Sequence, residues 1–266
     1  MKTVLRIIIT SLFVAFIFTP GFTQQTLKKI AERGELRVGM SANQPPFTMK
    51  AKDGSIIGYE ADLASILANS IGVELSLVAI PFPELLNALE EGKVDVVMSG
   101  MTITLKRNMR VAFAGPYILS GKSILTKTAS FSDTDESEDL NEDNIKLVVL
   151  KGSTSEIYVK NDMPEAKLFL ADSYNDAIAL LENGTANVMV ADYPICAYTM
   201  LVEPERNLVT LDKPLTIEPI GMALPPDDAH FHNMIQNYLN FLAVSGALEL
   251  LEIKWFESAS WVPYVK

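Results

Sequence analysis

The sequence predicts an α/β protein built from two lobes of like construction. The chain has 266 residues, more than one average domain, and 48% of them are hydrophobic, which allows a sizeable core. Strand-like and helix-like segments alternate, as is typical of βαβ units and mostly parallel sheets. A helix–Gly–strand unit also occurs once in each half of the chain, and this repetition indicates two similar lobes.

The first half supplies the elements of one lobe. Residues 61–71 have apolar side chains at helical spacing and stop at Gly72, while residues 83–91 begin with Pro and stop at Gly92. Alternating or continuous apolar runs predict strands at residues 36–40, 73–80 and 94–98.

The second half repeats this pattern. Residues 84–98 and 176–190 each contain an acidic start, an apolar-faced helix, a Gly and a β-rich run. Chance similarity is the alternative, because helix–Gly–strand is a common connection. Between the halves, residues 130–144 are strongly acidic but lack EF-hand spacing, so we expect a solvated surface segment there.

The first segment is typical of a secretory signal peptide, which we place at residues 1–23. Lys2 and Arg6 precede an almost wholly apolar run, residues 7–18, and a helix-breaking Pro-Gly pair follows. The run is too short for a comfortable membrane span, so we expect cleavage near Thr23. An uncleaved anchor is the alternative.

Charge and cysteine content narrow the function classes. The formal net charge is −11, and loss of the two cations of the signal makes the mature chain more acidic still. Such a surface repels phosphate backbones, so nucleic acid is not expected as a partner. Cys196 has no second cysteine for an internal disulfide and lies in an apolar run, so we expect it to pack in a core.

No segment carries a catalytic, metal or cofactor motif. The G-x-S-x-G and H-E-x-x-H patterns are absent. Residues 115–123 end in Gly-Lys-Ser like a phosphate loop, but five residues rather than four separate the glycines. His230 and His232 lie in a polar segment without further metal ligands nearby. We therefore expect binding rather than catalysis, with no metal and no cofactor.

Residues 95–117 carry the main binding signal. The predicted strand ends at Met98, small and polar residues follow, and Arg107 lies where a helix is expected to start. Ligands of open α/β sheets bind beyond the carboxyl ends of the strands, and an Arg there offers a planar fork for a carboxylate. A surface ion pair is the alternative, for which Lys106 and Arg110 are equally suited.

This segment resembles the signature of the family 3 solute-binding proteins, the periplasmic receptors for polar amino acids in ABC transport. The resemblance rests on residues 101–107, MTITLKR, and residues 112–117, AFAGPY. It extends over the mature chain. Three further groups of residues, at 33–39, 45–47 and 58–64, and the C-terminal SWVPY at 260–264 also resemble the family.

The resemblance implies a two-lobed, type II-like periplasmic-binding-protein fold with a two-strand hinge. The chain would cross between the lobes near residues 119–127 and return near 216–224. Lobe 1 would hold residues 24–120 and 223–266, and lobe 2 would hold residues 121–222. The resemblance also implies a periplasmic monomer that closes on a free amino acid and delivers it to an ABC transporter permease.

The resemblance assigns the grip on the amino-acid head group. Arg107 would hold the α-carboxylate, assisted by Thr102 and by the turn that contains Ser153 and Thr154. The backbone at or beside Gly100 would accept a hydrogen bond from the α-amino group. Asp192 would pair with the α-ammonium, and an N-cap of the following helix is its alternative or additional role.

The side-chain pocket is expected mainly in lobe 1, at Phe82, Ser41, Gln44 and Phe47. The family often has an acidic residue near position 41 for cationic ligands, so Ser41 weakens the case for a cationic amino acid without excluding one. The Asn-Gln pair at positions 43 and 44 suits a polar uncharged or acidic amino acid. Two other functions fit the same resemblance. One is a periplasmic dehydratase similar to cyclohexadienyl dehydratase, and the other is a soluble, ligand-loaded partner of a sensory receptor.

Overall fold

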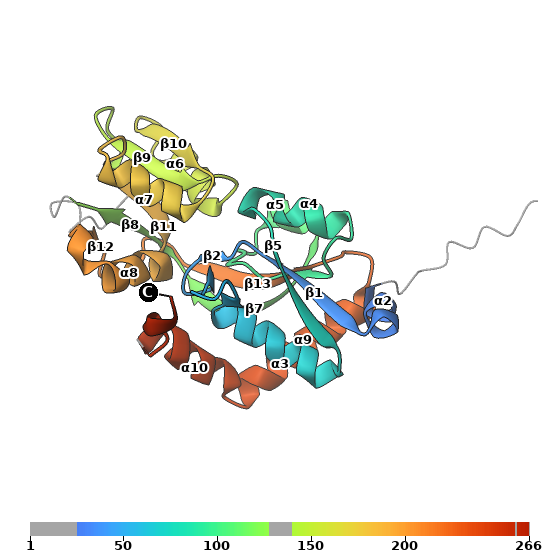
Figure 1. Cartoon of the computed structure of the whole chain (residues 1–266). Coiled ribbons are helices and arrows are strands. Elements are labelled where there is room, and N and C mark those ends of the chain that lie inside the picture. Colours follow the sequence, from blue (N-terminus) through green and yellow to red (C-terminus); the bar gives the residue numbers. More distant parts are fainter. Residues whose placement is uncertain (1–25, 128–139, 259, 266) are drawn as a thin grey trace, which may run out of the picture.

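The computed structural model describes residues 26–127, 140–258 and 260–265. The predicted signal peptide and most of the acidic segment at 130–144 lie outside the described residues. The chain forms two lobes, each built on a five-stranded sheet with helices packed against it (Figure 1). The first sheet contains β5 (Glu74–Ala79), β1 (Glu35–Met40), β6 (Val96–Val97), β13 (Glu218–Leu224) and β7 (Ala112–Ser120), in that order.

The second sheet repeats the plan of the first. It contains β10 (Lys167–Ala171), β9 (Lys146–Leu150), β11 (Val188–Asp192), β8 (Lys122–Thr126) and β12 (Val209–Thr210), in that order. In each sheet the first three strands are parallel and the last two join antiparallel. Both sheets are therefore mixed. They contain fewer parallel strand pairs than the alternation of strands and helices predicts, because the hinge strands β13 and β8 run antiparallel to β6 and β11. A smaller sheet adds β2 (Asn43–Gln44), β3 (Thr48–Lys50) and β4 (Ile56–Ile57).

The repeated helix–Gly–strand unit is present in both lobes. In lobe 1, α4 (Leu85–Glu90) is followed by Gly92 and β6, and in lobe 2, α7 (Tyr174–Glu182) is followed by Gly184 and β11. The φ angles of these glycines are 68° and 76°, a left-handed conformation that other residues adopt at a cost. Both units therefore end their helix in the same way and return the chain into the centre of a sheet.

The two lobes are joined by two closely packed crossings. The chain passes from β7 through Gly121 into β8 and returns through residues 211–217 into β13. A Cβ atom on Gly121 would lie 1.8 Å from the carbonyl oxygen of Thr216, so only glycine fits there. The crossings are also hydrogen-bonded, from Lys122 N to Thr216 Oγ1 at 2.9 Å and from Leu215 N to Lys122 O at 2.6 Å.

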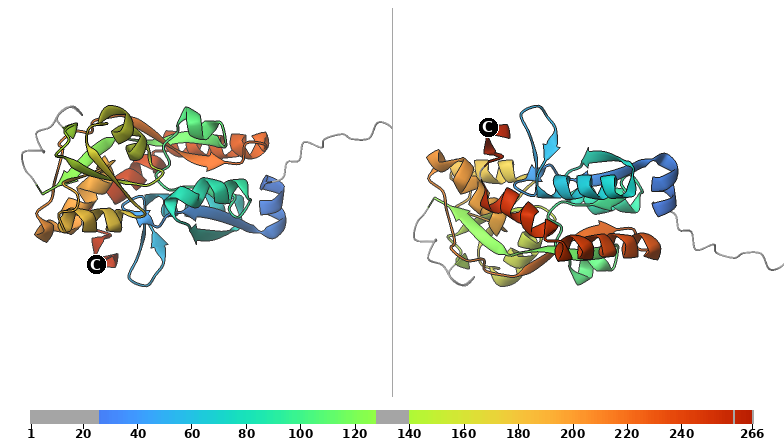
Figure 2. Two further views of the ribbon diagram at one scale, coloured as in Figure 1. Left: turned by 90° about the horizontal axis from the view of Figure 1, so that it is seen from above. Right: turned by 90° about the horizontal axis from the view of Figure 1, so that it is seen from below.

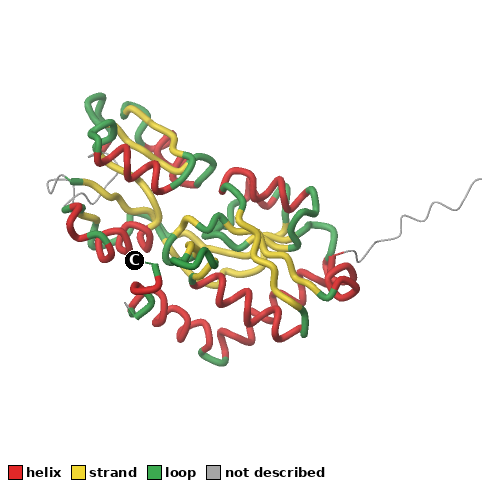
Figure 3. The backbone as a smooth tube through the Cα atoms, in the orientation of Figure 1, coloured by secondary structure: helices red, strands yellow, loops and turns green. Residues whose placement is uncertain are grey.

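Helices cover the faces of both sheets (Figure 3). Besides α4, lobe 1 has α2 (Thr26–Arg33), α3 (Tyr59–Ile71), α5 (Leu105–Asn108), α9 (Ala229–Val244) and α10 (Ala247–Glu252). A π-helical turn at Ile253–Glu257 follows α10. Lobe 2 has α6 (Thr154–Asp162) and α8 (Tyr193–Val202) besides α7. Short 3₁₀ turns lie at Phe82–Glu84, Pro204–Arg206 and Val262–Tyr264.

The hydrophobic core is divided between the lobes and their contact. One cluster fills lobe 1 and another fills lobe 2, while a third joins Phe82 and Met101 of lobe 1 to Leu150 and Tyr174 of lobe 2. Cys196 is fully buried in this third cluster, as the apolar run around it predicts. The shared cluster means that the lobes lie against each other in a closed arrangement.

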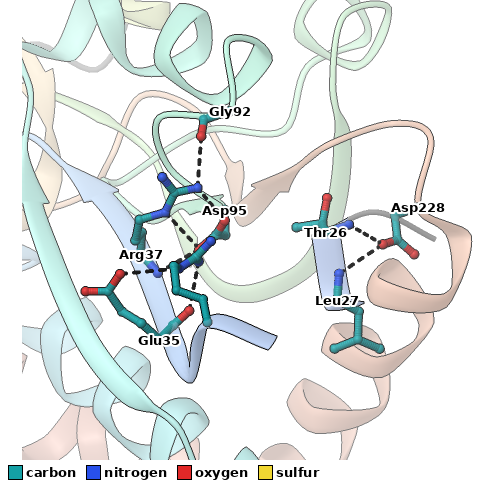
Figure 4. Close-up of polar contacts among 8 residues, drawn as sticks. Thr26, Leu27, Glu35, Arg37, Gly92, Asp95 and Asp228 are labelled. Carbon is teal, nitrogen blue, oxygen red and sulfur yellow. Dashed lines mark hydrogen bonds and ion pairs between the residues drawn. The ribbon is translucent and has the colours of Figure 1, made fainter. Parts of the chain in front are cut away.

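Two buried carboxylates fix the amino-terminal edge of lobe 1 (Figure 4). The Asp95 carboxylate forms an ion pair with the Arg37 guanidinium at 2.9 Å, and it also accepts a hydrogen bond from the Arg37 backbone nitrogen at 2.8 Å. The Asp228 carboxylate accepts from the backbone nitrogens of Thr26 and Leu27, at 3.0 and 3.1 Å. These contacts lie at the amino ends of β1, β6 and α2, so they leave the carboxyl ends of the strands free for function.

The C-terminal segment of lobe 1 reaches lobe 2. The rings of Tyr198, on α8, and Trp261 stack with centroids 5.4 Å apart, and Trp255 lies 5.2 Å from Trp261. Figure 1 and both views of Figure 2 place the end of the chain near the helices of lobe 2. Within the described residues, no helix has both the length and the apolar character needed to cross a membrane.

Candidate functional site between the lobes

Polar side chains of the first lobe gather at the carboxyl ends of β1 and β6. The Ser99 hydroxyl donates to Gln44 Oε1 at 2.5 Å and accepts from the backbone nitrogen of Ser41 at 3.0 Å. The Ser41 hydroxyl also donates to Gln44 Oε1, at 2.8 Å. Gln44 is only 2% exposed, so this network fixes its amide beside the turn that contains Gly100.

A buried carboxylate lies behind this turn. The backbone nitrogen of Gly100, whose φ is 55°, donates to Glu60 Oε1 at 2.8 Å, and the Tyr117 hydroxyl donates to the same oxygen. The second Glu60 oxygen has no hydrogen-bond partner among the described residues. Because its N–H is taken by Glu60, Gly100 has only its carbonyl oxygen to offer a ligand.

Glu60 makes stability depend on pH. Burial raises the pKa of its carboxyl from 4.5 to about 7, although hydrogen bonds from Tyr117 and Gly100 oppose the shift. The folded state binds this proton more tightly than the unfolded chain does. Its contribution to stability is therefore present below pH 4.5 and is lost as the pH rises through about 7.

We expect Glu60→Gln to remove this loss of stability. The free energy of unfolding of the wild type should fall by about 2.5 kcal/mol more than that of the variant between about pH 5 and about pH 8. Urea unfolding at both pH values measures the difference, with Glu74→Gln at the exposed start of β5 as the control. Equal pH dependence in Glu60→Gln and the wild type would contradict this role.

Arg107 spans from the first lobe to the second. Its backbone nitrogen donates to the Thr104 side chain, which caps α5, and Nη1 donates to the Thr102 carbonyl at 2.8 Å. Nη2 donates to the Gly152 carbonyl of lobe 2 at 3.2 Å. Burial lowers the pKa of Arg107, and within the described residues it makes no ion pair with a carboxylate. A surface ion pair belongs instead to Arg110, which contacts Glu90 at 2.5 Å.

Phe82 lies beside Arg107 and closes the cleft from lobe 1. The Arg107 guanidinium carbon lies 5.7 Å from the centre of the Phe82 ring, a cation–π distance. Phe82 lines two cavities of about 410 and 280 Å³, on the sides of Arg107 and of Gln44 respectively. Its ring therefore separates the charged part of the cleft from the polar pocket around Ser41.

We expect Phe82→Ala to loosen the contact between the lobes. The ring is 6% exposed and packs in the cluster shared by both lobes, so truncation should cost about 3 kcal/mol of unfolding free energy. Urea unfolding measures the loss, and Phe241→Ala, at a residue 68% exposed, is the control. If Phe82→Ala lowers the free energy of unfolding no more than Phe241→Ala does, burial of the Phe82 ring in the shared cluster adds no stability.

The two threonines predicted to assist Arg107 meet across the cleft. Their hydroxyl oxygens, Thr102 Oγ1 and Thr154 Oγ1, lie 3.3 Å apart, and each donates to Glu218 Oε2 at 2.8 Å. Ser153 is the N-cap of α6, and its hydroxyl accepts from Glu156 N at 3.3 Å. Thr154 therefore faces the opposite lobe, while the Ser153 hydroxyl is used to begin a helix.

Asp192 is 4% exposed and lies at the end of β11. It occupies the N-cap position of α8, but its side chain makes no capping hydrogen bond, so the helix does not account for the carboxylate. Asp192 Oδ1 lies 2.5 Å from Lys122 Nζ, and that ammonium also lies 3.0 Å from Glu218 Oε2. Burial raises the pKa of Asp192, an effect that the Lys122 charge opposes.

Sequence reasoning missed Lys122 and Glu218. Burial works to raise the pKa of the Glu218 carboxyl, but Lys122 and the two threonine hydroxyls reverse this and lower it overall. The signal available in the sequence was a lysine that begins an otherwise uncharged hinge strand, within the Gly-Lys-Ser run. The structure also places Phe47 in the core, fully buried and in edge contact with Phe256 at 5.3 Å, behind the polar pocket.

The described residues contain no group of three His, Cys, Asp or Glu side chains arranged for a metal ion. What they bring together is one arginine, one lysine and two carboxylates: Arg107, Lys122, Asp192 and Glu218. These are buried or half-buried groups at the meeting of two lobes and a hinge. Such a set suits a small ligand that carries both a positive and a negative charge.

The chain is similar in sequence and in structure to amino-acid-binding proteins and also to a dehydratase. A cyclohexadienyl dehydratase of Pseudomonas aeruginosa is 25% identical over 88% of this chain and 87% of its own. An ABC transporter arginine-binding protein of Escherichia coli is 24% identical over 94% of this chain and 98% of its own. The crystal structure of an ancestral amino-acid-binding protein, a precursor of cyclohexadienyl dehydratase, has a TM-score of 0.81 and 37% identity, covering 87% of this chain and 100% of its own.

The family assignment rests on most of the chain. A family model matches residues 36–258, which include both sheets, the two crossings and every charged group of the cleft. The two-lobed architecture and the order of motifs from the first strand to the C-terminal segment agree with it. The protein therefore belongs to the bacterial extracellular solute-binding proteins, family 3.

Proposed function

We propose that the protein captures a free amino acid between its lobes in the periplasm and delivers it to an ABC transporter. One observation carries the proposal: Arg107, from lobe 1, and Asp192, from lobe 2, carry opposite charges where the lobes meet, close enough for the Asp192 charge to act on Arg107, and Arg107 has no carboxylate partner among the described residues. The arginine-binding relative and the ancestral amino-acid-binding protein support the same class of ligand.

The head group of an amino acid matches these charges. A buried zwitterion must have both charges paired, because an unpaired ion in a closed cleft is costly. Arg107 offers a planar fork for the α-carboxylate, and the hydroxyls of Thr102 and Thr154 lie close enough together to add hydrogen bonds. Asp192 offers a carboxylate to the α-ammonium, together with the Gly100 carbonyl.

The pocket around Gln44 favours a polar uncharged or acidic side chain. Ser41 and Gln44 offer hydroxyl and amide groups, and Phe82 and the buried Phe47 provide apolar support. Exposed Lys50 and Asp172, which also line this cavity, are of opposite charge, so the pocket itself carries no net charge.

Closure of the hinge completes the site. We propose that residues 24–120, with the return strand β13 and the residues after it, move against lobe 2, with Gly121 and residues 211–217 as the pivots. The boundary expected at residue 222 falls inside β13, which belongs to the sheet of lobe 1. Arg107 contacts Gly152, and Asn43 Oδ1 accepts from the Tyr174 backbone nitrogen at 3.2 Å, so both lobes are needed for the full set of contacts. A closed, ligand-loaded form is then what the transporter recognises.

Calorimetric titration of the mature protein with the common amino acids tests the proposal. We expect saturable binding of at least one of them, with its loss in Arg107→Ala. Absence of heat with every amino acid would contradict the proposed function.

A dehydratase on the same fold is the second candidate, favoured by the relative from Pseudomonas aeruginosa. Turnover of prephenate or arogenate by the purified protein would support this candidate over transport. We expect neither substrate to be consumed.

A further inference from the structure

The groups expected to hold an amino-acid head group already contact two side chains of the protein itself. The hydroxyls of Thr102 and Thr154, expected at the α-carboxylate, each donate to Glu218 Oε2 at 2.8 Å. The Asp192 carboxylate, expected at the α-ammonium, lies 2.5 Å from Lys122 Nζ. The Glu218 carboxylate thus occupies the position expected for the ligand α-carboxylate, and the Lys122 ammonium occupies the position expected for the α-ammonium.

Lys122 and Glu218 also form a pair with each other, with Nζ and Oε2 3.0 Å apart. Resting on the proposed function, we propose that the Lys122–Glu218 pair is an internal stand-in for the zwitterionic head group, which an incoming amino acid replaces group for group. The pair has the two charges of a head group, and the lysine is only 1% exposed. Its two residues begin the strands β8 and β13, one on each crossing of the hinge.

The exchange keeps the hydrogen bonding of the cleft balanced. The ligand carboxylate takes over the threonine hydroxyls, its ammonium takes over Asp192, and Lys122 and Glu218 keep each other as partners. The pair does not neutralise Arg107, whose side chain donates hydrogen bonds to the backbone carbonyls of Thr102 and Gly152. The new ion pair at Arg107 therefore favours the ligand over the internal pair.

The pair also connects the lobes. Through Glu218 it joins Thr102 of lobe 1 to Thr154 of lobe 2, and through Lys122 it joins the hinge to Asp192. The internal pair thus stabilises closure in the same way as a ligand and competes with it for the same groups. Competition of this kind lowers the apparent affinity for any amino acid.

The double variant Lys122→Gln/Glu218→Gln removes both charges and keeps the cleft neutral overall. Neutral hydrogen bonds are weaker than charge-assisted ones, so the amides should compete poorly with a ligand. We expect the variant to bind the same amino acid about tenfold more tightly than the wild type by calorimetry. The matched control, Lys93→Gln/Glu91→Gln, removes a 2.6 Å ion pair before β6, away from the cleft, and should bind like the wild type.

The outcomes separate the two proposals. If the wild type binds an amino acid and the double variant binds it equally or more weakly, the stand-in is wrong and the pair belongs to the ligand contacts. If the wild type binds no amino acid, the proposed function itself fails. Should the double variant not fold, a crystal structure of the wild type with its amino acid decides. The ligand ammonium on Asp192 in place of Lys122 supports the inference, and an unchanged Lys122–Asp192 contact overturns it.

Discussion

Replacing Arg107 with alanine is expected to weaken amino-acid binding by at least about 100-fold. The guanidinium lies between the lobes with its two terminal nitrogens on backbone carbonyls of Thr102 and Gly152. Unlike Lys122, it is a buried cation without a carboxylate partner among the described residues, so the ligand α-carboxylate is its natural counterion. Calorimetric titration of the variant with the amino acid bound by the wild type measures the loss.

Arg107→Lys sharpens the same test. It keeps the charge but loses the planar fork, so we expect affinity between those of alanine and arginine at this position. Arg110→Ala is the matched control, because Arg110 lies three residues along the chain and pairs with Glu90 on the surface. An equal loss of affinity in Arg110→Ala and Arg107→Ala would show that overall charge, and not the fork, holds the ligand.

Replacing Asp192 with asparagine is expected to affect both binding and stability. The carboxylate is buried and pairs with Lys122, which would keep Glu218 as its only counterion. Loss of one partner of a buried ion pair should lower the free energy of unfolding by about 3 kcal/mol. Loss of the partner for the α-ammonium should weaken binding by about 100-fold.

Urea unfolding and calorimetry measure the two effects of Asp192→Asn separately. Asp212→Asn, at an exposed position within the return crossing, is the control for loss of a negative charge near the hinge. Normal affinity in Asp192→Asn, with or without a loss of stability, would contradict the assignment of the α-ammonium to this residue.

Local signals predict the elements well where they are complete within the segment. The helix predicted over 61–71 is α3, and it ends at Gly72 with φ 70°, because glycine tolerates the left-handed cap. The strand predicted over 94–98 corresponds to β6, whose paired residues are only Val96–Val97. Its hydrogen bonds nevertheless continue, from Asp95 N to Arg37 O at 2.9 Å and from Met98 N to Gly39 O at 3.0 Å.

The charged groups of the cleft show where sequence reasoning stops. The position of Arg107 after a strand end indicated a carboxylate site, and a surface ion pair was its alternative, for which Arg110 was equally suited. The structure shows that Arg110 makes such a pair, with Glu90. Lys122 and Glu218 lie far apart in the sequence and meet only because the two hinge strands cross side by side. Their pairing depends on tertiary contacts, and no local pattern encodes it.

The most direct test of the account uses analogues of the amino acid that binds best. One analogue lacks the α-ammonium and the other lacks the α-carboxylate, and both are titrated into the wild type by calorimetry. A grip on both charges by Arg107 and Asp192 predicts that each analogue binds at least about 100-fold more weakly than the amino acid. Binding of either analogue with the affinity of the amino acid would contradict it.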